Sequence, residues 1–146
     1  MKSFMKKMML AGAVLAVLPV LAACDKPGGD DTPQADVTGI WELSSVSTKA
    51  SVGGVNVNVY LEFGSDGSFD LYQKIGEGRY TYFEGTYVFD KEQNQLTGNY
   101  AGGSAWGPYA VEQQGSSLTL TSRGGKEVDS YKKIDAIPAS VTDNLY

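Results

Sequence analysis

The stretch from Gly54 to Ile75, GVNVNVYLEFGSDGSFDLYQKI, decides the fold. Apolar and polar residues alternate in its first half, and the alternation resumes after GSDGS at 64–68. A period of two predicts strands with one buried face, and the glycine-rich segment between them predicts a hairpin turn. The predicted buried faces carry Val55, Val57, Val59, Leu61 and Phe63, then Phe69, Leu71, Gln73 and Ile75.

The same pattern recurs on both sides of this hairpin. Six further strands are predicted over 39–47, 84–90, 96–101, 108–114, 117–123 and 127–135, joined by short polar or glycine-rich turns. No segment shows a helical period. Eight short strands at this spacing favour an all-β fold, an eight-stranded antiparallel up-and-down barrel, because closure removes the exposed edges of the sheet.

The predicted inward-facing side chains are mostly large. They are Trp41, Leu43, Val57, Leu61, Phe63, Phe69, Leu71, Tyr87, Phe89, Leu96, Tyr100, Leu118 and Leu120. An eight-stranded barrel is just wide enough to be filled by such side chains or to hold one small ligand. The sequence therefore leaves two alternatives: a filled core, or an aromatic-lined cavity near one mouth of the barrel. The long connection 74–85 is predicted to hold a short extra strand or to form a flap over one mouth.

The chain before the barrel has the features of an export signal. Three lysines precede the 16-residue apolar run 8–23, which is short for a membrane span and ends in small residues. This pattern predicts a signal peptide over 1–23 that is removed. A flexible acidic tether follows over 24–36, then the barrel over 37–135 and a C-terminal tail over 136–146.

The one cysteine of the chain, Cys24, stands directly after the apolar run. With no second cysteine, it is a free thiol, half of an intermolecular disulfide, or a covalent attachment point. The sequence LAAC at 21–24 resembles the lipobox of bacterial lipoproteins. That resemblance implies acylation of Cys24 and anchoring to a membrane of the cell envelope, with the outer membrane of a Gram-negative cell favoured and the periplasmic or surface face undecided.

Charge excludes one class of partner. Without the three lysines of the signal peptide, nine basic and 17 acidic residues remain, a formal net charge of −8. Nucleic-acid-binding proteins carry basic patches, so nucleic acid is not an expected partner. We expect a monomer.

The barrel sequence also resembles a known family. Gly39-Ile40-Trp41 matches the Gly-x-Trp motif of lipocalins, and the series of hairpins is similar to small lipocalin-like lipoproteins of Gram-negative bacteria. The resemblance covers residues 37–135. It implies a barrel closed at one end by Trp41, with Gly39 also structural at that base, and non-covalent binding of a small, often apolar molecule. The basic residue that packs on this tryptophan in the family would be Arg123, Lys132 or Lys133.

Catalytic chemistry has little support in the composition. The chain has no histidine, which removes the commonest general base and most zinc sites. Glu77, Glu84 and Glu112 could form a carboxylate pair, but any acidic barrel offers such pairs. The oxygen ligands of DKEQNQ, 90–95, mimic a calcium loop without its glycine and distal glutamate, so a polar turn is the better interpretation. We therefore expect no enzyme activity, no cofactor and no metal.

Aromatic residues are the remaining candidates for a binding site. The hypothetical ligand-binding set is Tyr80, Tyr82, Phe83, Tyr87, Tyr100 and Trp106. In a purely structural interpretation, these rings plug the ends of the barrel. In a functional interpretation, they form a rim that contacts a ligand. The leading hypothesis is binding of a small apolar or amphipathic molecule. The alternative is a protein-binding module, such as an envelope inhibitor of lysozyme or a protease, acting through loops 76–85 and 102–108.

Overall fold

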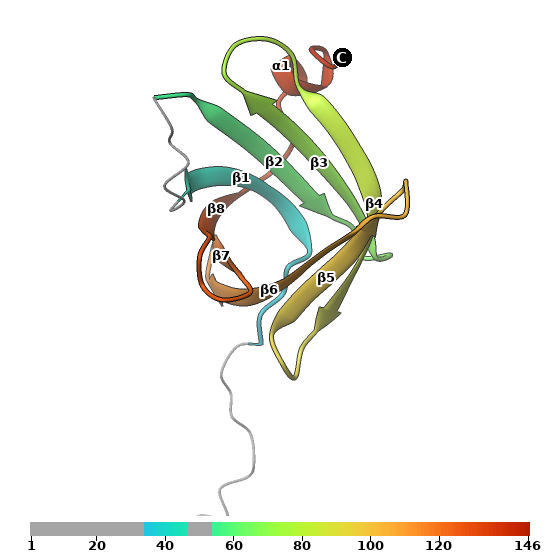
Figure 1. Cartoon of the computed structure of the whole chain (residues 1–146), viewed down its shortest axis with the longest axis vertical. Helices are drawn as coiled ribbons and strands as arrows, with labels where there is room; N and C mark the ends of the chain where they lie inside the picture. Colours follow the sequence, from blue (N-terminus) through green and yellow to red (C-terminus); the bar gives the residue numbers. More distant parts are fainter. Residues whose placement is uncertain (1–33, 47–53) are drawn as a thin grey trace, which may run out of the picture. The chain divides into compact units, whose positions relative to one another are not determined.

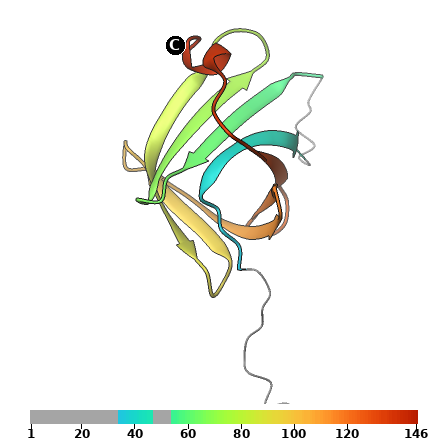
Figure 2. The same ribbon diagram turned by 180° about the vertical axis from the view of Figure 1, so that it is seen from behind.

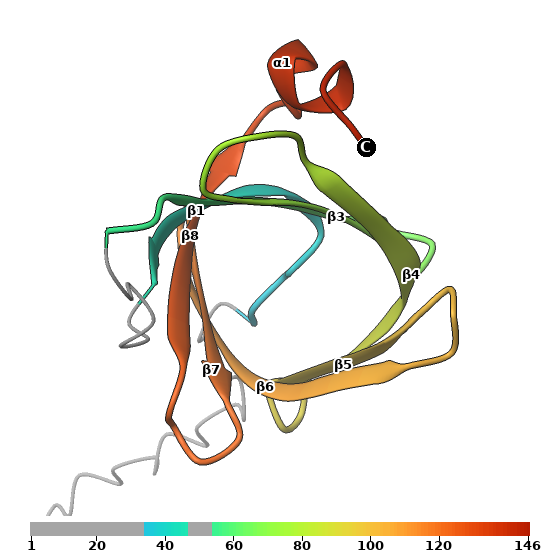
Figure 3. The ribbon, with the colours of Figure 1, turned by 45° about the horizontal axis from the view of Figure 1, so that its top comes forward.

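The computed structural model describes residues 34–46 and 54–146, and within them the chain forms one closed antiparallel barrel (Figure 1). Each strand pairs with its neighbours in sequence, and β8 returns to β1 (Figure 3). The strands are β1 (Gly39–Val46), β2 (Val57–Phe63), β3 (Ser68–Ile75), β4 (Thr81–Asp90), β5 (Gln95–Tyr100), β6 (Ala105–Gln114), β7 (Ser117–Ser122) and β8 (Val128–Ile134). The predicted eight-stranded up-and-down barrel is confirmed.

Several predictions fall on the N-terminal part of the chain. The signal peptide, Cys24 and nearly all of the tether lie outside the described residues. Among the residues that the structure does describe, no helix is long and apolar enough to cross a membrane.

The β2–β3 hairpin forms as the alternation predicts, except that Val55 and Ile75 at its open end are exposed. Phe63 pairs with Phe69 and Leu61 pairs with Leu71, so their side chains share the inner face. The turn is fixed by Asp66, whose carboxylate accepts hydrogen bonds from the backbone N–H of Ser68 at 3.0 Å and from its hydroxyl at 2.6 Å. Gly67 takes a φ of +84°, which an L side chain rarely adopts.

The inner face of the barrel holds the hydrophobic core. All thirteen side chains predicted to face inward belong to this core or pack against it. The core also includes side chains that the inward set lacked: Ala35, Val37, Val59, Trp106, Tyr109, Val111 and Tyr131. Period-two alternation thus identifies the buried face, and the additional residues come from β2, β6, β8 and the segment before β1.

One end of the barrel is closed around Trp41. Its indole Nε1 donates a 2.8 Å hydrogen bond to the carbonyl of Val37, and both residues are buried completely or nearly so. Figure 3 shows the segment before β1 crossing inside the outline of the ring. This geometry closes the end with the segment that leads into β1, as the resemblance implied for Trp41.

Lys133 is the basic residue that packs on Trp41. Its ammonium lies 5.4 Å from the centroid of the indole ring and 3.4 Å from the carbonyl of Thr38. Lys132 instead forms an exposed ion pair with Glu42 at 2.9 Å. Gly39 has a φ of +131°, and a Cβ there would come within 2.9 Å of the Lys133 side chain. The base of the barrel therefore needs glycine at this position.

The connection between β3 and β4 is shorter than predicted. Only residues 76–80 lie outside strands, because β4 already begins at Thr81 and pairs with β3 along Gln73↔Thr81 to Ser68↔Thr86. The prediction that this connection forms a flap over one mouth of the barrel is therefore wrong. The predicted turn over 102–107 is also too long, since β6 begins at Ala105 and includes Trp106.

The segment after β8 packs on the outer surface of the barrel. Its short helix α1 (Ala139–Thr142) places Val141 in a second apolar cluster with Tyr60 and Tyr80. Leu145 forms a parallel bridge with Tyr80. Figure 2 shows α1 beside the turn that joins β3 to β4. Residues 136–146 therefore cover outward-facing aromatic rings of the sheet.

Candidate functional site

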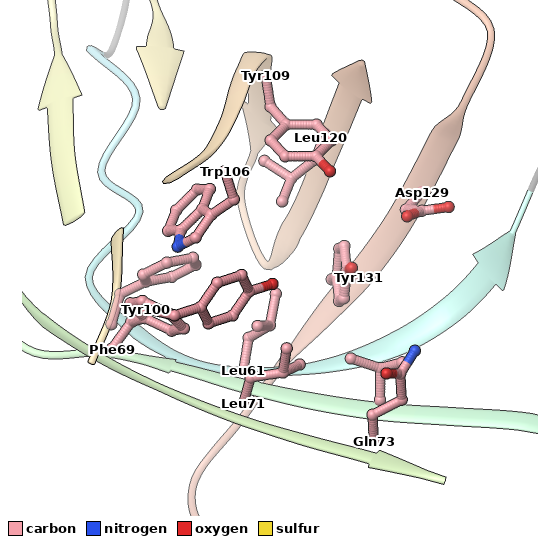
Figure 4. A pocket seen from close by; sticks show the side chains of 12 residues that line it. Leu61, Phe69, Leu71, Gln73, Tyr100, Trp106, Tyr109, Leu120, Asp129 and Tyr131 are labelled. Carbon is pink, nitrogen blue, oxygen red and sulfur yellow. The ribbon is translucent and has the colours of Figure 1, made fainter. Parts of the chain in front are cut away.

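The barrel encloses a cavity of about 220 Å³, and this cavity is the candidate site (Figure 4). Twelve residues from β2, β3 and β5 to β8 line it. They are Val59, Leu61, Phe63, Phe69, Leu71, Gln73, Tyr100, Trp106, Tyr109, Leu120, Asp129 and Tyr131. Between the two alternatives that the sequence left open, the structure favours the aromatic-lined cavity over a filled core.

Aromatic rings form one wall of the cavity. Trp106 meets Phe69 edge to face with ring centroids 5.2 Å apart, and Phe69 meets Tyr100 at 5.7 Å. Tyr109 lies 6.3 Å from Trp106. Figure 4 shows these rings opposite Asp129 and Gln73. The wall is rigid because each ring is held by at least one other ring.

Trp106 faces inward because its neighbour on β5 is glycine. Gly98 pairs with Trp106, and the β5–β6 register shifts between Leu96 and Gly98. A Cβ on Gly98 would collide with the six-membered ring of the indole. The absence of this one carbon gives the indole room to lie flat against β5.

Two buried polar atoms of the lining lack a hydrogen-bond partner within the described part of the chain. They are the indole Nε1 of Trp106 and Oδ1 of Asp129. Buried polar groups in folded proteins are nearly always paired with protein or water, so such atoms need an explanation. Both atoms belong to side chains that line the cavity, so the lining contains a donor and an acceptor that the described protein leaves unpaired.

The titratable groups of the cavity lining are one carboxyl group and three phenols. Burial raises the pKa of the Asp129 carboxyl above its ordinary value of 3.8, and the nearby Glu127 carboxylate raises it further. Burial, then Asp129 and then Tyr109 raise the pKa of Tyr131. Burial, followed by Glu127, Tyr100 and Asp129, raises that of Tyr109. No lysine or arginine is among the twelve lining residues.

The structure divides the six aromatic residues of the predicted site. Tyr100 and Trp106 line the cavity. Tyr87 faces inward at the closed end, where its ring meets Phe63 at 4.9 Å and its hydroxyl donates to the carbonyl of Gly64 at 2.7 Å. It therefore helps to plug that end.

The other three residues of that set lie away from the cavity. Phe83 is on β4, 38% exposed, with its ring 5.7 Å from that of Tyr100. Tyr82 lies on the same strand but faces outward, and its hydroxyl donates to Asp70 and Glu84. Tyr80 packs outside the barrel, its ring 6.1 Å from that of Tyr60. Tyr82 and Phe83 thus belong to β4 and not to a loop, and together with Tyr100 they line a second pocket.

Ten of the twelve lining residues were missing from the predicted ligand-binding set, and three of these ten were not predicted to face inward either: Tyr109, Asp129 and Tyr131. The alternation did contain a signal for them. Tyr109 is two residues before Val111, and Asp129 is two residues before Tyr131. Because residues i and i+2 share a face of a strand, each pair points inward together. The signal for Asp129 is that it places a carboxylate at an inward-facing position of a strand.

The acidic residues considered for other chemistry lie on the surface. Glu77, Glu84 and Glu112 are all exposed, and the hydroxyl of Tyr82 donates to Glu84. Asp90 accepts hydrogen bonds from the backbone N–H groups of Glu92 and Gln93 at 2.9 and 3.0 Å, so it caps a hairpin turn. Within 34–46 and 54–146, no group of three His, Cys, Asp or Glu side chains is placed to hold a metal ion.

The eight antiparallel strands and the aromatic-walled interior cavity define the class of closed up-and-down β-barrels. Sequence comparison agrees with this class. The model of the lipocalin-like domain matches residues 37–134, and the chain belongs to that family. Proteins of this family are generally binding proteins.

Comparison with solved structures finds one similar fold and one weaker match. The lipoprotein YedD from Klebsiella pneumoniae subsp. pneumoniae is 12% identical, with a TM-score of 0.50 over 75% of this chain and 80% of that one. A DUF4847 family protein from Bacteroides vulgatus is 14% identical, with a TM-score of 0.44 over 68% of this chain and 95% of its own. No curated protein sequence matches this chain.

Proposed function

We propose that this protein is a lipid-anchored lipoprotein of the cell envelope whose barrel binds a small apolar or amphipathic molecule without catalysis. The observation that carries the binding role is the interior cavity, where aromatic rings lie opposite the Asp129 carboxyl group and two polar atoms of the lining lack a partner among the described residues. A concave, mostly apolar site with a few converging polar groups is the usual form of a small-molecule site. The lipocalin-like family supports the same role.

The size of the cavity limits the ligand. A cavity of about 150 Å³ lined by apolar side chains accommodates benzene. The 220 Å³ between β2, β3 and β5 to β8 therefore suits one ring with a short chain, or an aliphatic group of similar bulk. Drug-sized ligands need roughly 300–1,000 Å³. Long acyl chains and large cofactors are thus poor candidates.

Ligand binding should stabilise the protein, and filling the cavity should abolish this effect. For a single-ring compound at about 100 times its dissociation constant, the expected gain is roughly 2.7 kcal/mol, measured as a rise in melting temperature. Leu71→Trp places an indole in the space that the ligand needs and should remove the rise. Val88→Trp is the control, because Val88 is 67% exposed on the outer face of β4.

Two results would contradict the binding role. One is a panel of single-ring compounds that leaves the melting temperature unchanged. The other is a rise that persists in Leu71→Trp as strongly as in Val88→Trp.

The proposed anchor rests on the sequence before the barrel. LAAC at 21–24 resembles a lipobox, and the acidic, Pro- and Gly-rich residues after it suit a spacer between a membrane and the barrel. The structurally similar YedD is itself a lipoprotein, which supports the same anchor here. Outer-membrane attachment of a monomer is the favoured arrangement.

Cys24→Ser should release the protein from membranes without unfolding the barrel. A serine hydroxyl cannot form the thioether to a lipid, and stable anchoring requires two or more acyl chains. Membrane fractionation after a high-salt wash, with circular dichroism to check the fold, measures the effect. Retention of the serine variant in the membrane fraction would show that the anchor is not a lipid on Cys24.

A further inference from the structure

The cavity has an apolar side and a polar side, and the charges on the polar side are negative. In Figure 4, Phe69, Trp106 and Tyr100 lie on one side, whereas Asp129 and Gln73 lie on the other, with Tyr131 near them. Asp129 is the charged residue of the lining, and Glu127 adds a second negative charge nearby. The polar side therefore presents a carboxylate, an amide and a phenol to whatever occupies the space.

The carboxylate of Asp129 lacks the partner that a half-buried charge needs. Its Oδ1 is inaccessible to solvent and accepts no hydrogen bond from any described residue. A buried charge without a partner is costly, and folded proteins pair such groups or neutralise them. Because no lysine or arginine is among the described residues of the lining, a ligand with a positive charge is a suitable partner for this carboxylate.

The aromatic rings favour the same sign of charge. Tyr100, Trp106, Tyr109 and Tyr131 all border the cavity, and the faces of tyrosine and tryptophan rings attract cations. Cation–π attraction strengthens when the cation is shielded from water. A carboxylate combined with several such rings is therefore a suitable environment for an ammonium group.

We infer that the ligand of this barrel is a small organic amine, whose ammonium group pairs with Asp129 and whose apolar body packs on Trp106 and Phe69. This inference rests on the proposed binding function and specifies the chemical class of its ligand. The 220 Å³ volume restricts the body to about one ring or its aliphatic equivalent. A neutral ligand of the same shape would leave the carboxylate unpaired.

Three probes that share a phenylethyl group and differ in charge test the preference of the site for an amine. Phenethylamine is cationic at pH 7, 2-phenylethanol is neutral and 3-phenylpropionate is anionic. Calorimetric titration into the full-length protein should give the tightest binding for the amine, by about tenfold or more over the alcohol, and no detectable binding of the carboxylate. A factor of ten or more is expected because losing one partner of a desolvated charge pair has a large effect on affinity.

Asp129→Asn should remove the preference for the amine. The substitution keeps the shape and deletes the charge, so phenethylamine should lose about tenfold or more in affinity, whereas 2-phenylethanol should lose little. Glu112→Gln is the matched control, because it deletes one negative charge from the exposed outer face of β6 and should change neither affinity. Equal losses in Asp129→Asn and Glu112→Gln would contradict a direct role of Asp129.

Stability of the unliganded protein provides a second readout. Because the folded state raises the pKa of Asp129, its ionised form opposes folding once the pH exceeds the ordinary value of 3.8. Among the described residues, Glu127, Tyr109 and Tyr131 are the titratable groups that interact with it, and none of these three is a cation. At pH 7, Asp129→Asn should therefore raise the melting temperature without ligand while weakening amine binding. A lower melting temperature would show that the carboxylate serves the fold.

The outcomes separate the two proposals. If none of the three probes binds and a wider panel of single-ring compounds also fails, both the binding function and the amine preference are wrong. If 2-phenylethanol binds as tightly as phenethylamine, and both lose binding in Leu71→Trp, the cavity binds ligands but the amine preference is overturned. Tighter binding of 3-phenylpropionate would overturn it as well.

Discussion

Trp41→Ala is expected to lower the free energy of unfolding by about 3–5 kcal/mol, the range for removing a fully buried large aromatic side chain. The indole is completely buried, and it joins three separate parts of the closed end. Its Nε1 holds the carbonyl of Val37, its ring lies under Lys133, and its body belongs to the main core. Alanine would leave a cavity and an unpaired carbonyl at once.

The effect should be measurable by urea denaturation. Since small domains are stable by only about 5–15 kcal/mol, the variant should be close to unfolding at 37 °C. Val88→Ala, on the exposed outer face of β4, is the control and should change stability by no more than about 0.5 kcal/mol. Similar midpoints for the two variants would show that Trp41 does not hold the closed end.

Gly98→Ala is expected to lower the free energy of unfolding by about 1–3 kcal/mol, because it overpacks the interior. The added methyl group would overlap the indole of Trp106 and come within 2.5 Å of the carbonyl oxygen of Thr86. The indole can rotate away only into the cavity, whereas the carbonyl belongs to the β4–β5 ladder and is fixed. The variant should therefore also lose ligand binding.

A matched pair of glycines makes this a strict test. Gly102→Ala adds the same methyl group where no atom lies within 4 Å, so its stability should match that of the wild type. Combining Gly98→Ala with Trp106→Ala should recover part of the stability lost in Gly98→Ala, since one of the two collisions disappears. If Gly98→Ala unfolds at the same urea concentration as Gly102→Ala, the packing of Trp106 on β5 is not as described.

The features set by local sequence were predictable. The alternation at 54–75 defines the first hairpin, its register and the faces of its side chains, because a period of two is a property of each strand alone. The same reasoning identified Trp41, Leu96 and Leu118 as core residues. Eight such strands with short turns then left the closed barrel as the arrangement without exposed edges.

Features that depend on pairing between strands were not predictable. Lys133 packs on Trp41 because β8 pairs with β1 in one particular register, Trp41↔Lys133, which nothing in either strand specifies. Trp106 stands between alanine and glycine and has the composition of a turn, yet Gly98 on the neighbouring strand gives it a place inside. The start of β4 was not predictable either. Tyr82 and Phe83 are both aromatic, so the sequence does not show that they face opposite sides of the strand.

The cavity itself is the least predictable part of the site. Its volume is the small difference between the interior of the barrel and the side chains that fill it, so a shift of one ring would open or close it. Asp129 was not predictable as a site residue, because a single inward carboxylate among apolar neighbours has meaning only once the cavity is known.

The most direct test of the account is the location of a bound amine. Intermolecular nuclear Overhauser effects between phenethylamine and the full-length protein should connect the ring of the ligand to Trp106 and Leu120, and its chain to Tyr131. All three residues face into the barrel. Contacts confined to outward-facing rings such as Tyr72 and Tyr82, with none to the three inward residues, would contradict the claim that the interior of this barrel is its binding site.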